Sequence, residues 1–329
     1  MNWLIKAAAQ KAIGALPASE SANYLFQRRV TRRLPIGDPG VARKFERALA
    51  HFRVFRERVA RSPEKAVFYE FGAGWDLAVP LSYAVLGVGR QTLVDIRPNL
   101  RLELVNATIA SLGRQRAQLE EEAGLELRDP GAPDVASVGD LERRFGITYL
   151  APRDARSTGL PAGTVDFVSS TNTLEHVPPE DIAPILSECA RLLAPGGSMS
   201  FRIDMQDHAS YTDRRVSAYH FLRFSDRTWR LLTSDVSYQN RLRLPDYRRL
   251  FAKSGLEIVA EAIARPTAEH LAALDAVELA PRFRSYSRED LAARTLEVVL
   301  TPERLPDATQ ELEDLARARA TGVRPRAGA

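Results

Sequence analysis

The 329-residue sequence contains a single cysteine, Cys189, and no long hydrophobic run. One cysteine excludes an internal disulfide framework and a zinc site built from cysteines. No apolar stretch reaches the roughly 18 residues that a membrane-spanning helix needs. There is also no repeat of fixed period, which excludes a repeat architecture. What is present is ordinary for a globular chain, since hydrophobic residues make up 45% and charged residues 27%.

The net charge of +4 hides an uneven distribution. Residues 1–62 contain 13 Lys and Arg against 4 Asp and Glu, and the rest of the chain is mildly acidic. Apolar residues recur at near-helical spacing over residues 2–16, without the apolar core and cleavage site of a signal peptide. We therefore expect a cytoplasmic protein. The basic helical arm either touches the inner face of a membrane or a partner protein, or packs on its own domain.

From residue 65 onward, short apolar runs alternate with helical segments. Such alternation predicts an α/β fold, namely a doubly wound, mostly parallel seven-stranded sheet with helices on both faces. The expected strands cover residues 66–70, 92–95, 147–150, 165–169, 198–203, 256–262 and 296–300. The expected helices cover residues 76–88, 99–112, 182–193, 246–254 and 268–279.

The domain organisation follows from where this alternation is interrupted. We expect a basic helical N-terminal arm over residues 1–62 and one α/β domain over residues 63–304. Two insertions are predicted in the domain, a polar one at 113–145 and one rich in aromatic residues and arginine at 205–245. Residues 305–329 are expected to form a C-terminal helix and a disordered tail.

The first expected strand ends in Glu70 and is followed by Gly72-Ala73-Gly74. Glycines let the chain turn sharply and let a ligand approach the backbone. The ligand would then lie at the carboxyl end of the strand, near the start of the next helix. The dinucleotide fingerprint needs a third glycine three residues further on, where this sequence has Leu77. A nicotinamide-dependent oxidoreductase is therefore disfavoured.

Polar residues also follow the next strands. Asp95 ends the second strand, where a carboxylate can accept hydrogen bonds from both hydroxyls of a ribose. Asp154 follows the third strand, where it could accept a hydrogen bond from an adenine amino group or instead anchor a local turn. The fourth strand leads into residues 170–177, and the turn Leu193-Ala-Pro-Gly-Gly197 precedes the fifth.

This ordered set resembles the class I S-adenosylmethionine-dependent methyltransferases, over about residues 65–204 and less specifically up to about 301. The resemblance implies S-adenosyl-L-methionine as cofactor and assigns a part of it to each matched residue. Trp75 and Asp76 depart from the small residues that are frequent after the glycines. The implied contacts are Glu70, Gly72, Ala73 and Gly74 to the methionine part, Asp95 and Ile96 to the ribose and adenine, Asp154 and Ala155 to the adenine, and Asn172 and Glu175 to the sulfonium end.

Methyl transfer to a hydroxyl also needs a group that removes the proton. His208 is the first candidate because a histidine titrates near neutral pH, and Asp204 and His176 also follow strands that face the cofactor. Each of them could instead have a structural role. Asp204, Asp207 and His208 could ligate a divalent metal, but their spacing is not diagnostic, so no metal site is predicted.

Residues 205–245 are the segment expected to bind the acceptor. Aromatic side chains there suit a sugar ring or a planar small molecule, and arginines suit a phosphate or carboxylate. The same aromatic residues could simply pack a lid over the core. We expect O-methylation of a small-molecule or glycan-type acceptor. Alternatives are an aminopropyltransferase or a non-catalytic cofactor-binding scaffold, and nucleic-acid methylation is disfavoured because no Asn-Pro-Pro-Tyr or Pro-Cys motif occurs.

Overall fold

A computed structural model of the chain describes residues 2–14, 19–30, 34–234 and 237–303. The predicted C-terminal helix and tail at 305–329 lie outside these residues. Within them, no helix is long and apolar enough to cross a membrane.

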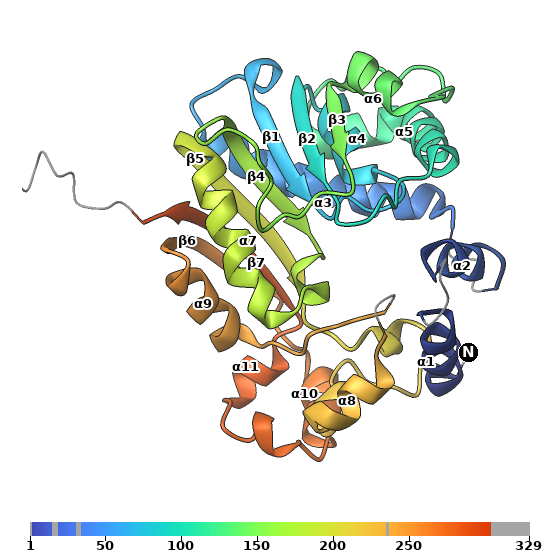
Figure 1. Cartoon of the computed structure of the whole chain (residues 1–329), viewed down its shortest axis with the longest axis vertical. Helices are drawn as coiled ribbons and strands as arrows, with labels where there is room; N and C mark the ends of the chain where they lie inside the picture. The colour runs from blue at the N-terminus through green and yellow to red at the C-terminus, as the bar shows by residue number, and fades with distance from the viewer. Residues whose placement is uncertain (1, 15–18, 31–33, 235–236, 304–329) are drawn as a thin grey trace, which may run out of the picture.

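Seven strands form one sheet in the order β3-β2-β1-β4-β5-β7-β6, which confirms the predicted α/β fold (Figure 1). All neighbouring pairs are parallel except those of β7, which runs antiparallel to β5 and to β6. Because five parallel strands share one direction, the carboxyl ends of β1, β2, β4 and β5 meet at one edge. The strands are β1 Val67–Phe71, β2 Arg90–Val94, β3 Ile147–Leu150, β4 Val165–Thr171, β5 Leu193–Asp204, β6 Leu256–Ile263 and β7 Thr295–Pro302.

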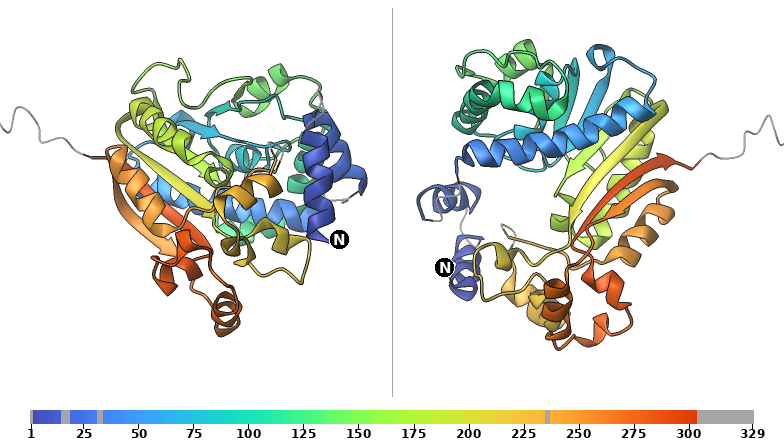
Figure 2. Two further views of the ribbon diagram at one scale, coloured as in Figure 1. Left: turned by 60° about the horizontal axis from the view of Figure 1, so that its bottom comes forward. Right: turned by 180° about the vertical axis from the view of Figure 1, so that it is seen from behind.

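Helices cover both faces of the sheet, as the two-residue alternation of the strands requires. Phe68 and Phe167 belong to the apolar cluster under α3 (Gly37–Arg58), α4 (Ala78–Val85) and α5 (Leu102–Ala123). Their neighbours Tyr69 and Val168 belong to the cluster under α7 (Pro179–Leu192) and α9 (Leu244–Lys253) on the other face. Figure 2 shows the long helix α3 running across its face of the sheet.

Helix α3 corrects the prediction that residues 1–62 form one arm outside the domain. Phe45, Phe52 and Phe55 are buried, and the ring of Phe55 lies 4.8 Å from that of Phe68 in β1. Several of the basic residues that suggested an arm occupy the exposed face of this amphipathic helix, namely Arg43, Arg53, Arg56 and Arg58. The elements of this region that lie outside the core are α1 (Trp3–Gly14), α2 (Ser19–Leu25) and the short η1 (Phe26–Val30).

The predicted insertion at 113–145 is also part of the core. Helix α5 continues to Ala123, and α6 (Val138–Phe145) follows with a Ser137 N-cap. Leu119 and Leu141 are completely buried in the same cluster as the sheet residues. The charged residues that indicated an insertion lie on the solvent side, where for example Arg116 pairs with Glu120. The polar residues therefore lie on one face of these helices, and the opposite face belongs to the core.

Residues 205–245 form a cap at the carboxyl edge of the sheet. They contain three short helices, and with the segment after β6 they enclose a third apolar cluster that includes Tyr219, Phe221, Leu274 and Phe283. The aromatic residues thus largely pack a lid, one of the two interpretations that the sequence allowed. The short helices of the described chain are η2 Pro63–Lys65, η3 Leu174–His176, η4 His208–Tyr211, η5 His220–Arg223, α8 Asp226–Leu232, α10 Ala268–Asp275, η6 Pro281–Phe283 and α11 Arg288–Ala292.

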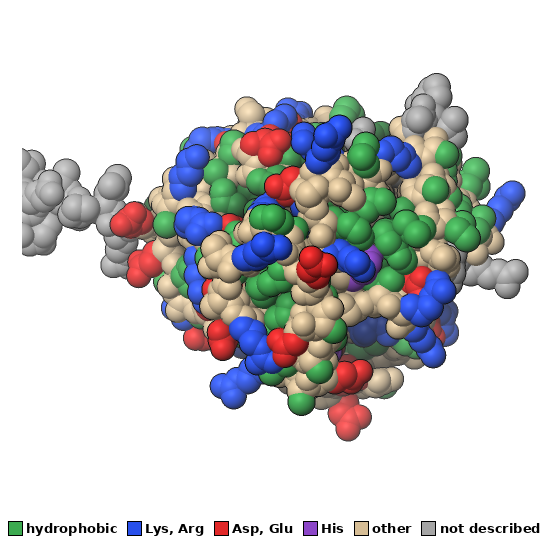
Figure 3. Space-filling view, turned by 90° about the horizontal axis from the view of Figure 1, so that it is seen from below, with side chains coloured by type: hydrophobic (Ala, Val, Ile, Leu, Met, Phe, Trp, Pro, Cys, Tyr) green, Lys and Arg blue, Asp and Glu red, His purple; other side chains and the backbone are tan. Residues whose placement is uncertain are grey.

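Helix α1 lies beside α8 on this cap. The Trp3 ring packs against His220 at 4.9 Å and Phe224 at 6.0 Å, and Lys11 Nζ donates a hydrogen bond to the Leu231 carbonyl. Packing on its own molecule was one of the alternatives for this helix, and nothing supports a membrane contact. On the face viewed in Figure 3, Lys and Arg side chains are interspersed with Asp and Glu and do not form one basic patch.

Candidate functional site

The carboxyl edge of the sheet begins with a buried carboxylate at the end of β1. Glu70 lies in the core of the sheet between β2 and β4, where Ser169 Oγ donates to its Oε2 at 3.4 Å. Burial raises the pKa of Glu70 to about 8, against the opposing effect of the Lys44 charge. Because this pKa lies near neutral pH, a cationic ligand bound nearby would readily convert Glu70 to its ionised form.

The glycine turn after Glu70 has the backbone that only glycine adopts easily. Gly72 has φ +74° and Gly74 has φ +78°. A Cβ on Gly72 would lie 2.4 Å from Cγ2 of Thr173, so the turn touches the segment that follows β4. Next to Gly74 there is open space for a ligand. This geometry suits the predicted role of the turn as a cofactor contact.

Asp95 and Ile96 follow β2 and have opposite environments. The Asp95 carboxylate is buried and accepts a hydrogen bond from the Tyr149 hydroxyl at 3.1 Å. Burial raises the pKa of Asp95 to about 7. The adjacent Ile96 is 66% exposed, which is high for a large apolar side chain. A buried acceptor beside an uncovered apolar surface fits a ribose with its attached adenine ring.

Asp154 is occupied by its own loop. Its carboxylate accepts hydrogen bonds from the Arg156 backbone at 2.8 Å and from the guanidinium of that residue at 2.7 to 3.1 Å. These bonds hold the pKa of Asp154 below its usual range. The turn-anchoring alternative for Asp154 is thus the observed geometry, and its contact with adenine stays a prediction, as does that of the Ala155 backbone.

A cavity of about 330 Å³ lies beyond the ends of β4 and β5, under the cap. Its wall combines three parts of the chain that are distant in sequence. They are the N-terminal helices (Trp3, Lys6, Ala7, Gln10 and Gln27), the ends of β4 and β5 with the residues after them (Asn172, Glu175, His176, Asp204, Asp207, His208, Ala209, Tyr211 and Thr212), and the segment from α8 onward (Trp229, Leu232, Thr233, Ser237 and Gln239). The cavity therefore forms only when these three parts of the chain are folded together.

Two residues after β4 present unsatisfied oxygens to this cavity. Asn172 has φ +55°, a strained conformation for a non-glycine residue, and its side-chain oxygen accepts no hydrogen bond from the described residues. Glu175, at the middle of η3, is 1% exposed, and neither of its carboxylate oxygens has a hydrogen-bond partner there. Burial raises its pKa well above the usual value. Strain and unsatisfied oxygens make this corner a candidate ligand-binding site.

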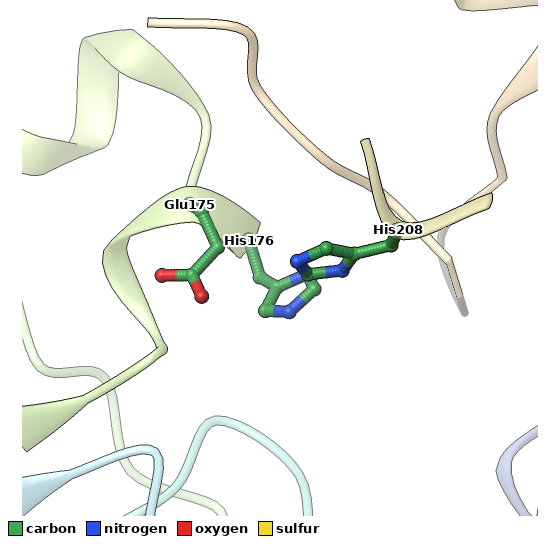
Figure 4. A group of neighbouring side chains, drawn as sticks. All are labelled: Glu175, His176 and His208. Atoms are coloured by element: carbon green, nitrogen blue, oxygen red, sulfur yellow. The ribbon is translucent and has the colours of Figure 1, made fainter. Parts of the chain in front are cut away.

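Two histidines lie beside Glu175 (Figure 4). The His176 and His208 rings are 5.0 Å apart, although η3 carries one and η4 the other. His176 Nδ1 lies 2.7 Å from the Tyr238 carbonyl oxygen. The His176 side chain is exposed at the cavity, yet the protein atoms packed near its ring, together with the nearby His208, lower the pKa of His176 to about 4.

The end of β5 supplies the neighbouring acid. His208 Nε2 lies 3.6 Å from Asp204 Oδ2, which also accepts a hydrogen bond from the Tyr211 hydroxyl. Burial alone would raise the pKa of Asp204, but His208 and Tyr211 outweigh it, so that pKa is lowered. Asp207, the third acid of this stretch, instead caps η4 and contacts His220 at 3.2 Å. It stands apart from the Asp204–His208 pair.

The structure thus divides the predicted residues into two adjoining groups. Glu70, the glycine turn, Asp95 and Ile96 lie at the ends of β1 and β2. Asn172, Glu175, His176, Asp204 and His208 line the cavity. The Thr173 contact with Gly72 joins the groups, so a cofactor on the first group would direct its sulfonium end toward the second.

The sequence did not indicate that the N-terminal helices contribute to the cavity. Trp3, Lys6 and Gln10 of α1 line the cavity, and Tyr24 of α2 packs on Trp75 next to the glycine turn at 5.8 Å. The available signal was the amphipathic pattern of residues 2–16, which indicates a buried face without indicating what it covers.

Comparison with known proteins gives a match to a family described as "Methyltransferase domain" over residues 129–201, which include β3, β4, α7 and most of β5. The ubiquinone biosynthesis O-methyltransferases of Escherichia coli O9:H4 and Vibrio parahaemolyticus are each 32% identical, over 89 and 90 residues. These alignments cover 27% of this chain, and the chain spans little more than a third of the length of either relative, 36% and 37%. A geranyl diphosphate C-methyltransferase from Streptomyces coelicolor, solved with S-adenosyl-L-homocysteine, is 12% identical with a TM-score of 0.40, over 77% of this chain and 80% of that one.

The family match includes β4 and most of β5, which lead into the cavity, and the sheet has the seven strands and mostly parallel pairing of the predicted fold. These matches support a class I S-adenosylmethionine-dependent methyltransferase, and the match to the family itself is confined to residues 129–201. S-adenosyl-L-methionine is the cofactor of that class.

Proposed function

We propose that this protein transfers the methyl group of S-adenosyl-L-methionine to a hydroxyl oxygen of a small-molecule or glycan-type acceptor. The observation that carries the proposal is the adjacency of two sites. The buried carboxylates and glycine turn after β1 and β2 adjoin, through the Thr173 contact with Gly72, a polar cavity that contains the Asp204–His208 pair.

The cofactor-side residues match the parts of S-adenosyl-L-methionine. The Asp95 carboxylate would accept hydrogen bonds from the ribose hydroxyls, and Ile96 would cover one face of the adenine. Glu70, with its high pKa and buried position, would become ionised against the positive amino group of the methionine part. The glycine turn would let the backbone approach the same part.

The cavity limits the size and the chemistry of the acceptor. Its volume of about 330 Å³ lies at the small end of ligand pockets, which range over roughly 300–1,000 Å³. Its lining carries many hydroxyl, amide and carboxylate groups with the aromatic rings of Trp3, Tyr211 and Trp229 among them. Such a lining suits a compact molecule with several hydroxyl groups and one ring face. The names of the curated relatives favour oxygen as the methylated atom.

Transfer from a sulfonium is an in-line displacement with a good leaving group, so positioning contributes most of the rate. A hydroxyl nucleophile must also lose its proton as the new bond forms. The Asp204–His208 pair, with His176 beside it, is where that proton would go. The acceptor oxygen then forms its bond to the methyl carbon as the carbon–sulfur bond breaks, leaving S-adenosyl-L-homocysteine.

Two experiments test this proposal. Calorimetry with S-adenosyl-L-methionine should give saturable binding to the wild-type protein and about tenfold or greater weakening in Asp95→Ala, because a hydrogen bond to a charged group contributes about 1.5–3 kcal/mol. An acceptor screen with mass detection should yield a product heavier by one CH2. Absence of binding at millimolar cofactor would refute the proposal, and binding with no methylated product from diols, phenols and sugars would favour a non-catalytic scaffold.

A further inference from the structure

The cavity contains a cluster of three side chains that the predicted chemistry uses separately and not as one binding site. Glu175, His176 and His208 each offer one ligand atom, and these atoms all lie within 4.8 Å of one another (Figure 4). From these residues we propose a binding site for a divalent transition-metal ion in the acceptor cavity. It is a site distinct from the one considered from the sequence, which combined Asp204, Asp207 and His208.

The spacing is close to what one ion requires. Bonds from zinc to nitrogen and oxygen ligands are about 2.0–2.2 Å long, so two ligand atoms on one ion lie at most about 4.4 Å apart. A small rotation of side chains that already converge would bring the three atoms onto one centre. Figure 4 shows the rings of His176 and His208 approaching each other from two separate segments, with the Glu175 carboxylate next to His176.

Glu175 supplies an independent reason for a cation. Its side chain is 1% exposed, lines the cavity and makes no hydrogen bond within the described part of the chain. A buried carboxyl group without partners costs free energy whether it is charged or neutral. Besides burial, the charge of Asp204 raises the pKa of Glu175, and the backbone N–H groups of Glu175 and Asp204 and the distant charge of Arg47 oppose this rise only in part. A bound cation would satisfy both of its oxygens.

The second sphere orients one of the histidines. His176 Nδ1 lies 2.7 Å from the Tyr238 carbonyl, which can only accept, so this nitrogen carries the hydrogen. Its Nε2 is then the unprotonated nitrogen that a metal needs. A ligating histidine that donates its other N–H to a carbonyl is the usual second-sphere arrangement.

The donor set selects the class of metal. Two imidazoles and one carboxylate favour zinc, manganese, iron(II), cobalt or nickel over magnesium and calcium, which prefer oxygen ligands throughout. Three protein ligands leave at least one coordination position open toward the cavity.

The role of the ion rests on the proposed function. A metal-bound hydroxyl loses its proton more easily than a free one. The acceptor oxygen would occupy the open position, and its proton would pass to the Asp204 carboxylate and on to solvent. The oxygen lone pair then forms the bond to the methyl carbon, and the carbon–sulfur bond pair returns to sulfur. In this form His208 is a ligand, and Asp204 replaces it as the proton acceptor.

The site is tested without cofactor or acceptor, so its failure is separable from that of the methyltransferase proposal. Full-length protein is stripped with a chelator and titrated with Co2+, whose visible absorption reports nitrogen ligation, and with Zn2+ by calorimetry. We expect one ion per chain. Glu175→Gln and His208→Gln should each weaken binding at least about tenfold, since even second-sphere changes cost 10- to 100-fold.

His220→Gln is the matched control, because His220 is also a histidine in the cap and contacts Asp207 outside the cluster. It should bind Co2+ as the wild type does. Circular dichroism melting identifies any variant that fails to fold. If Glu175→Gln does not fold, the Co2+ affinity of His208→Gln alone tests the proposal. No visible Co2+ spectrum, or wild-type affinity in either folded ligand variant, would overturn the proposal even if S-adenosyl-L-methionine binds normally.

Discussion

At the scale of single residues, the carboxylate of Asp95 is expected to link cofactor affinity to pH. Its pKa of about 7 is raised by burial, so the group is largely protonated below neutrality in the free protein. Ribose hydroxyls donate to the ionised form, and binding therefore favours ionisation. The contribution of Asp95 to affinity should rise with pH and level off above about pH 7, falling by up to about tenfold for each pH unit below it.

The measurement is calorimetry with S-adenosyl-L-methionine between about pH 5 and pH 6.5, where Glu70, with a pKa of about 8, is protonated in the free protein and would add its own proton release on binding. Asp95→Asn keeps the shape of the side chain and removes its titration. In that variant the slope over this pH range should fall by up to about one tenfold change per pH unit, and the slope that remains belongs to Glu70. The same slope in wild type and variant would assign the pH dependence to another group.

Gly72 tests the backbone of the same site. Alanine at this position would be strained at φ +74° and would also place Cβ 2.4 Å from Thr173 Cγ2. Gly124 has φ +67° and no heavy atom near the place that a Cβ would take, so Gly124→Ala has only the conformational cost of about 1 kcal/mol. We expect Gly72→Ala to lose about 1–3 kcal/mol more in urea unfolding, the cost of overpacking, and to bind cofactor weakly. Equal losses in the two variants would contradict a tight turn against Thr173.

At the scale of elements, helix α1 is expected to act on the acceptor rather than on the cofactor. Trp3 anchors it through His220 and Phe224, and its backbone N–H donates to Asp213 at 3.1 Å. Trp3→Ala should raise the acceptor KM by about tenfold, since aromatic pairs contribute about 0.5–1.5 kcal/mol beyond burial, with cofactor affinity unchanged. The neighbouring Leu4 is 51% exposed, so Leu4→Ala is the control. A change confined to cofactor binding would refute this role.

The same scale shows what the sequence can predict. Every strand of the sheet lies within a few residues of its expected place, because buried parallel strands are short apolar runs between turn residues. The motif at Glu70–Gly74 and Asp95 is detectable because it occupies strand ends, whose position in an α/β fold is fixed. In contrast, the predictions of an arm and a polar insertion are wrong for α3, α5 and α6, because the charged outer faces of these helices dominate their composition.

The cavity itself is beyond prediction for a related reason. It needs α1, the end of β4, η4 and α8, and no local pattern brings Trp3 to His208 or His208 to Glu175. Both His176 and His208 are candidates from their place after β4 and β5. Their convergence with a buried, unpaired glutamate depends on how the cap closes, which is a long-range property.

At the scale of the whole molecule, one buried arginine side chain connects the cap to the sheet. Arg243 is completely buried at the start of α9 and donates to the carbonyls of Met205 after β5 and of Leu291 and Ala293 in and after α11. Desolvation lowers the pKa of Arg243 to about 10, and it remains charged at neutral pH. The carbonyls come from both sides of the boundary between the sheet cluster and the cap cluster.

Replacing this arginine should therefore loosen the cap and lower stability together. Arg243→Met keeps much of the volume but leaves three buried carbonyls without a donor, at about 1–3 kcal/mol for each group left unsatisfied. We expect a loss of at least about 3 kcal/mol in urea unfolding, and acceptor turnover should fall at temperatures where cofactor still binds, because the cap holds η4 and α8 over the cavity. Arg249→Met is the control, since Arg249 is exposed and its partner Asp246 keeps its hydrogen bonds from the Arg243 backbone and the Tyr286 hydroxyl, so the change should cost less than about 1 kcal/mol. Similar losses in the two variants would mean that the cap is held by its apolar cluster alone.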